Sequence, residues 1–173
     1  MKALLRSSLR LIDRLSPPGK AYAHCDIPCG IYDPHLAQIG ALTCIRMNQL
    51  INDLGDAPGP GDKEKNDAWH NSLARYVTVK EEHAELVKKE VRIIWGDYFK
   101  PEHLEKHPDL NTLTWNIMKL ASTVRQQVNM QAAQDLLAEV QKFAEAFWAT
   151  KDAAVQRQPS RTPAGGEVVL PKA

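Results

Sequence analysis

The sequence lacks any apolar run close to the roughly 20 residues that a membrane-spanning helix needs, so stable membrane insertion is not expected. Cysteine is scarce: three in 173 residues are too few for the disulfide framework of a chain this long. No strand pattern competes with helix, and no internal repeat is found. These absences favour a soluble helical domain whose cysteines do chemistry or bind a metal.

Basic residues are in deficit outside the first 23 positions. That leader holds five basic residues and one acid, which leaves 17 Lys and Arg against 20 Asp and Glu in the rest, a formal charge of −3. A mildly acidic body offers no broad basic surface for phosphates. Nucleic acid is therefore not an expected partner.

Residues 1–23 read as an amphipathic basic segment, separated from the rest of the chain by Pro17-Pro18-Gly19. Arginines interrupt its leucines, so it lacks the unbroken apolar core of a secretory signal, although Ala21-Tyr22-Ala23 resembles a cleavage site. A transit peptide, a membrane-surface helix and a removable pro-segment are all compatible with this pattern. We favour a removable pro-segment and a cytoplasmic protein, with an organellar or exported destination left open.

Past the leader, apolar residues recur at three- and four-residue spacing in four stripes, the pattern of amphipathic helices. The first predicted helix runs from about residue 34 to 53, and the second is long and ends near Lys100. Asp109 is placed to cap the third, and a weakly marked break near Asn129 precedes the fourth. The sequence thus predicts an all-α fold, an antiparallel four-helix bundle over residues 34–155 with an N-terminal metal-binding hook.

Two segments are predicted to lie outside the helices. Residues 55–66 combine glycine and proline with charges, which is typical of a loop. The tail, residues 156–173, is rich in polar residues, proline and glycine, and we expect it to be disordered.

One imidazole and two thiols lie within six positions directly after the leader, at His24, Cys25 and Cys29. Imidazole and thiolate are metal ligands, and Pro28 with Gly30 would bend the chain so that both thiols face one point. Zinc and iron–sulfur sites usually draw four protein ligands from two separated pairs. The side chains alone therefore fall short of a complete site.

Cleavage after Ala23 would change the donor count. A free amine on His24, the amide nitrogen of Cys25 and two thiolates make a planar set of two nitrogens and two sulfurs, with the His24 imidazole as an axial fifth ligand. Such a set suits nickel or copper(II) and stabilises the oxidised metal enough for one-electron cycling. We expect a redox-capable site only after processing.

The run from His24 to Pro34, HCDIPCGIYDP, closely resembles the nickel hook of nickel-containing superoxide dismutases, which are made with a short pro-segment. Trp95–Pro101 is similar to the family's stretch after its second helix, and Phe147–Lys151 to its carboxyl end. The resemblance covers residues 24 to about 151. It implies a homohexamer of four-helix subunits, a protease that removes residues 1–23, and one nickel ion per subunit that cycles between Ni(III) and Ni(II) to convert superoxide to oxygen and hydrogen peroxide.

The resemblance also implies a role for each hook residue within 24–33. The metal ligands would be His24, Cys25 and Cys29, and hook geometry would depend on Pro28 and Gly30. Substrate access would involve Tyr32 and the backbone amide of Asp26. The carbonyl of Ile31 would receive the imidazole N–H, as contacts around ligating histidines usually do. Lys100 would attract the superoxide anion.

The sequence departs from the family pattern at two positions. A glutamate in the first helix and an arginine in the second support the imidazole in familiar members, and Gly40 and His83 stand at the matching positions here. Our hypothesis is that His83 or a water takes over this support.

Two other classes of function remain open from the residues. The first is a non-catalytic helical bundle in which Cys25 and Cys29 form a dithiol switch or bind a structural metal. The second is an interaction protein whose basic leader stays attached and docks to a partner or membrane. Cys44, inside the first predicted helix, is interpreted as a small buried hydrophobe.

Overall fold

The computed structural model describes residues 30–59 and 61–172. All the helices and strands that it describes lie within the unit Ile31–Ala173. The predicted metal ligands and the leader fall outside the described residues. None of the described helices is both long enough and apolar enough to cross a membrane.

Four long helices lie over the four predicted apolar stripes. They are α2 (His35–Asp53), α3 (Lys63–Ile93), α5 (Leu110–Gln126) and α6 (Met130–Ala149). Side-chain caps define several of their starts: Asp33 Oδ1 accepts the His35 N–H at 2.7 Å, and Asn129 Oδ1 accepts the Ala132 N–H at 3.0 Å. The predicted break near Asn129 is thus a helix start with a side-chain cap.

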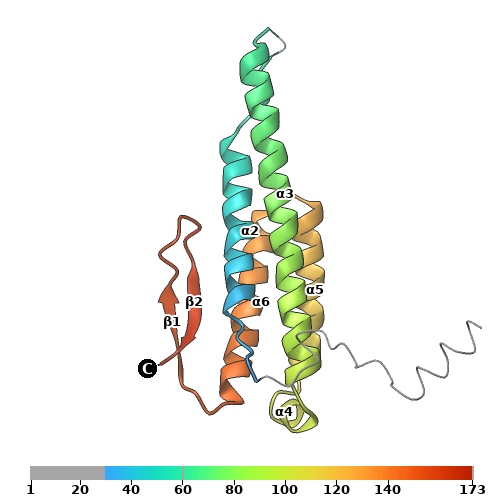
Figure 1. Ribbon diagram of the computed structural model, residues 1–173, viewed down its shortest axis with the longest axis vertical. Helices are drawn as coiled ribbons and strands as arrows, with labels where there is room; N and C mark the ends of the chain where they lie inside the picture. The colour runs from blue at the N-terminus through green and yellow to red at the C-terminus, as the bar shows by residue number, and fades with distance from the viewer. Residues whose placement is uncertain (1–29, 60, 173) are drawn as a thin grey trace, which may run out of the picture. The chain divides into compact units, whose positions relative to one another are not determined.

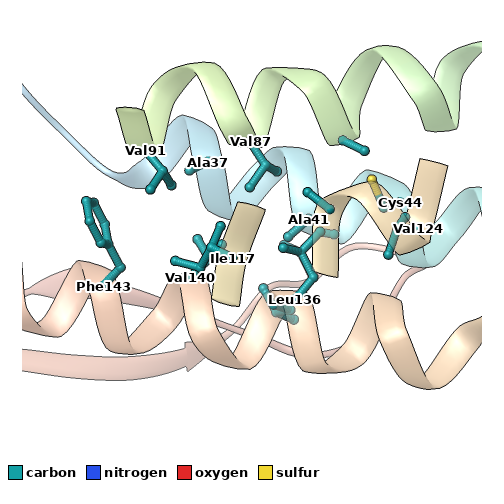
Figure 2. Close-up of a cluster of buried hydrophobic side chains, with 14 of the residues drawn as sticks. Ala37, Ala41, Cys44, Val87, Val91, Ile117, Val124, Leu136, Val140 and Phe143 are labelled. Atoms are coloured by element: carbon teal, nitrogen blue, oxygen red, sulfur yellow. The ribbon is translucent and has the colours of Figure 1, made fainter. Parts of the chain in front are cut away.

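The four helices form a closed ring in which α2 packs on α3 and α6, and α5 packs on the same two helices. They run alternately up and down (Figure 1), so each one directs its apolar stripe toward a shared core. Figure 2 shows side chains from all four helices meeting there. Fully buried members include Ala41, Val87, Ile117, Leu136, Val140 and Phe143. Burial of each large apolar side chain contributes about 1.5–3 kcal/mol.

The connection between α3 and α5 contains structure that the sequence pattern did not predict. A π-helical turn, η2 (Ile94–Tyr98), continues α3, and a fifth helix, α4 (Pro101–Lys106), follows it. Pro101 stands at the first helical position, where its fixed φ and missing N–H are tolerated. This proline starts α4 shortly after η2 ends at Tyr98.

The prediction of an all-α fold is wrong, and so is the prediction of a disordered tail over residues 156–173. Strands β1 (Val155–Pro159) and β2 (Glu167–Pro171) form an antiparallel hairpin beside α2 and α6 (Figure 1). A two-stranded hairpin is marginal by itself. Here it is stabilised by the bundle, because Val168 and Val169 are buried, 7% and 1% exposed.

Candidate metal centre

The structure describes half of the residues that the sequence analysis selected for the site. His24, Cys25, Asp26, Pro28 and Cys29 lie outside the described residues. Gly30, Ile31, Tyr32, His83 and Lys100 lie inside them. The described residues therefore show the surroundings of the predicted metal centre but not its ligands.

Gly30 is the first described residue of the predicted hook, and its φ is +74°. An L side chain rarely adopts this conformation, and a Cβ built at Gly30 would meet no atom within 4 Å. Glycine is thus required by the backbone conformation and not by lack of space. It gives the chain a turn directly after the second predicted thiolate.

Tyr32 is half-buried and packs on an aromatic cluster at the end of the bundle. Its ring centroid lies 5.5 Å from that of Tyr98, which lies 4.8 Å from Phe147 on α6. The Tyr98 hydroxyl is 2.7 Å from Thr150 Oγ1, and either atom can be the donor. The position of Tyr32 is therefore coupled to both η2 and the end of α6.

The contact between Tyr98 and Tyr32 was not predicted from the sequence, although Tyr98 lies in the Trp95–Pro101 stretch that resembles the family. Two further groups lie against the Tyr98 ring. The His103 ring stacks on it with a centroid distance of 5.6 Å, and Lys151 Nζ lies 5.4 Å from the Tyr98 ring centroid. The sequence signal that pointed to an aromatic cluster was the pair of aromatic stretches around residues 95–101 and 147–151. The fold brings these stretches together.

Lys100 has an exposed side chain at the start of α4. Its backbone N–H donates to His103 Nδ1 at 3.1 Å, which fixes the turn from η2 into α4. The same imidazole stacks on Tyr98, so the backbone carrying Lys100 is tied to the ring that contacts Tyr32. An exposed ammonium at this position adds positive potential that is screened by salt.

Gly40 and His83, the two positions that depart from the family pattern, are neighbours across the contact between α2 and α3. A Cβ built on Gly40 would lie 2.9 Å from Val87 Cγ2 and 3.1 Å from the His83 carbonyl oxygen. A side chain at position 40 would therefore force the Val87 side chain and the facing backbone of α3 to shift. This packing explains the missing acid in physical terms.

The half-buried ring of His83 has a defined tautomer. Its Nδ1 lies 2.8 Å from the carbonyl oxygen of Val79, and because a carbonyl only accepts, Nδ1 carries the proton. In the neutral ring Nε2 is then an acceptor. His83 can therefore receive a hydrogen bond from an N–H donor.

Cys44, the third cysteine, is fully buried in the bundle core, where its Sγ contacts the Lys80 carbonyl oxygen at 3.6 Å. Burial raises the pKa of its thiol to about 12, an effect that the charge of Lys80 only partly offsets. At neutral pH this sulfur is a protonated thiol and not a metal ligand. The sequence-based interpretation of Cys44 as a buried small side chain agrees with this environment.

Comparison with known proteins gives consistent matches. The model of the family described as nickel-containing superoxide dismutase matches residues 19–151. The nickel superoxide dismutase of Streptomyces seoulensis is 33% identical over 144 residues, and that of Streptomyces coelicolor is 35% identical over 147 residues. Each match covers 83% of this chain and all of the relative.

Solved structures of nickel superoxide dismutase also resemble the fold. The native structure at 1.30 Å has a TM-score of 0.61 at 33% identity and covers 74% of this chain and 99% of that one. A structure with nickel ligation corresponding to the oxidised state has a TM-score of 0.64 at 32% identity, covering 75% and 100%. The family match ends at residue 151, before β1.

Proposed function

Because the chain belongs to the nickel-containing superoxide dismutase family, we propose that the nickel its function requires is held by His24, Cys25 and Cys29. The chain is a superoxide dismutase with nickel as cofactor, and it converts superoxide to oxygen and hydrogen peroxide. One observation supports the assignment of ligands: the match to the nickel-containing family covers residues 19–151, and within it one imidazole and two thiols lie at His24, Cys25 and Cys29.

The chemistry of this donor set fits nickel. A free amine, a backbone amide nitrogen, two thiolates and the His24 imidazole would supply the nitrogen and sulfur donors that suit nickel. When bound, nickel supplies a one-electron redox couple, Ni(III)/Ni(II). The amine donor requires cleavage before His24, so residues 1–23 act as a pro-segment and residues 24–33 form the hook.

The remaining residues act on the substrate and its approach. Tyr32, which contacts Tyr98, restricts substrate access, and the backbone amide of Asp26 takes part in it. Pro28 with Gly30 sets the bend of the hook. The exposed ammonium of Lys100 attracts the superoxide anion, an effect that falls with ionic strength.

We further propose that His24 is oriented by the Ile31 carbonyl and by His83. Substitution His83→Ala is expected to leave nickel bound but to change the nitrogen hyperfine coupling of the Ni(III) electron paramagnetic resonance (EPR) signal, because one of the two groups proposed to orient the His24 ring is lost. Turnover should fall about tenfold, at the lower end of what loss of such supporting contacts costs. The measurements are EPR spectra and pulse-radiolysis rates.

His70→Ala is the matched control for this variant. His70 also lies on α3 and makes the same intrahelical contact, from Nδ1 to the Asn66 carbonyl oxygen at 2.8 Å, but it is exposed. It should leave spectrum and rate unchanged. Identical spectra and rates for His83→Ala and the unsubstituted enzyme would show that His83 does not support the imidazole.

Intact mass and metal content of the protein from its source test the ligand assignment directly. We expect a chain that begins at His24 and carries one nickel per subunit. Retention of Met1, or zinc in place of nickel, would favour the two alternatives, a structural metal or dithiol site and an interaction protein that keeps its leader.

Assembly and location complete the proposal. We propose a homohexamer, and the exposed side chains of Trp115 and Val128, at 62% and 50%, supply apolar surface for subunit contacts. A processing protease acts between Ala23 and His24. A cytoplasmic location is proposed because the leader lacks the unbroken apolar core of a secretory signal.

A further inference from the structure

The C-terminal hairpin is bonded to α2 by two glutamines. Gln49 donates to the Ala164 carbonyl, between the two strands, at 3.2 Å, and the buried Gln38 bonds to β2 itself. Gln38, with no exposed surface, accepts the Val169 N–H through Oε1 at 2.7 Å and donates to the Val169 carbonyl through Nε2 at 3.0 Å. The amide thus satisfies both backbone groups of one strand residue, as a neighbouring strand would. No water is needed to pair this edge of β2 at Val169.

The strand register explains why Val169 is the residue held. Ser160 donates to Gly166 at 2.9 Å and Lys172 donates to Ala154 at 2.8 Å, so alternate cross-strand pairs are hydrogen-bonded. Val169 falls between bonded pairs, and its backbone groups point away from β1. Without Gln38 they would be buried and unpaired.

The other attachment of the hairpin is to α6. Gln141 donates to the Glu167 carbonyl at 2.7 Å and accepts from Arg157 at 3.1 Å, while Arg157 also donates to Glu145 at 2.8 Å. The hairpin is therefore bonded to two helices at once, through polar groups that flank the buried Val168 and Val169. It connects the first turns of α2 to α6.

We propose that the hairpin is a clamp that positions the start of α2, and that Gln38 is a positioning residue for the hook. Gln38 lies five residues after Asp33, the last residue of the hook, so the part of α2 that carries the hook is the part that the hairpin holds. Functional sites need their groups held to within about 0.5 Å. The effect on the metal rests on the proposed function, whereas the clamp itself does not.

The test compares three variants of the full mature chain. Gln38→Met keeps side-chain volume but removes both bonds to Val169, and Gln38→Ala is a second variant at the same position. Gln141→Ala is the matched control, because it loosens β2 from α6 without touching α2. Amide hydrogen exchange is measured on the metal-free chain, and the Ni(III) EPR linewidth on the nickel-loaded chain.

Both Gln38 variants should raise exchange at amides 35–40 about tenfold, since a buried pair of hydrogen bonds is lost, and should broaden the EPR signal. Gln141→Ala should speed exchange in β2 only and leave the signal unchanged. The clamp is refuted if Gln38→Met speeds exchange in β2 while amides 35–40 and the linewidth stay as in the parent. If the parent chain shows no nickel signal, the proposed function fails, and the exchange data still decide on the clamp.

Discussion

Substitution Cys25→Ser is expected to abolish nickel binding and superoxide turnover in the processed protein. The substitution replaces a soft thiolate with a hydroxyl that stays protonated at neutral pH and is a poor ligand for nickel. Loss of one of two thiolates also removes the charge that stabilises the oxidised metal. Turnover should fall by at least about 1,000-fold, equivalent to ~4 kcal/mol of transition-state stabilisation, measured by pulse radiolysis with metal analysis on the same samples.

Cys44→Ala is the matched control, because Cys44 is buried in the bundle core and is not one of the proposed ligands. Its thiol, with a pKa raised by burial to about 12, takes no part in metal binding at neutral pH. The control variant should keep nickel and turnover. Retained nickel and activity in Cys25→Ser would contradict the ligand assignment. Loss of nickel and activity in Cys44→Ala alone would indicate that the metal is bound in the bundle core.

The helices could be predicted because their signals are local. Asp33 before Pro34, and apolar residues at helical spacing, fix α2 without reference to the rest of the chain. The caps differ in detail, since Asp109 stands at the cap position of α5 but makes no side-chain hydrogen bond there. The residue at which a helix starts was therefore easier to predict than the hydrogen bond that caps it.

The hairpin could not be predicted in the same way, because its stability is not local. Its strands contain Arg157, Gln158 and Glu167 and bury only a few apolar side chains. Polar side chains of two helices hold them, among them Gln38, 131 positions away from Val169 in sequence, and Gln141 on α6. The only local signs were polar side chains in the helices, and these have no meaning until their partners are known.

In the candidate site too, features with a local sequence signal could be predicted and features that depend on distant residues could not. The proposed ligands of the hook were predicted from spacing and from their position after the leader, both of which can be read directly from the sequence. The support of Tyr32 was not, because Tyr98, Phe147 and Thr150 come from two distant segments that only the bundle brings together. Composition shows aromatic residues but not which of them meet.

Addition of one residue before His24 is expected to inactivate the enzyme. A chain that begins at Ala23 carries all the hook side chains, but the nitrogen of His24 is then an amide and no longer an amine. A free α-amino group, with a pKa of about 7.7–8.0, is readily available as a neutral donor near neutral pH, whereas an amide nitrogen is not. We expect turnover at least about 100-fold lower, or ~2.7 kcal/mol, with an altered Ni(III) EPR signal.

The comparison requires two chains that differ only by that residue: one that begins at His24 and one that begins at Ala23. Removal of Ala23 from the second chain by an aminopeptidase, followed by nickel loading, should restore both the rate and the EPR signal of the first. Restoration excludes misfolding as the cause, since the bundle is the same in both. Equal activity of the two chains before trimming would mean that the amine is not a ligand and that cleavage before His24 serves another purpose.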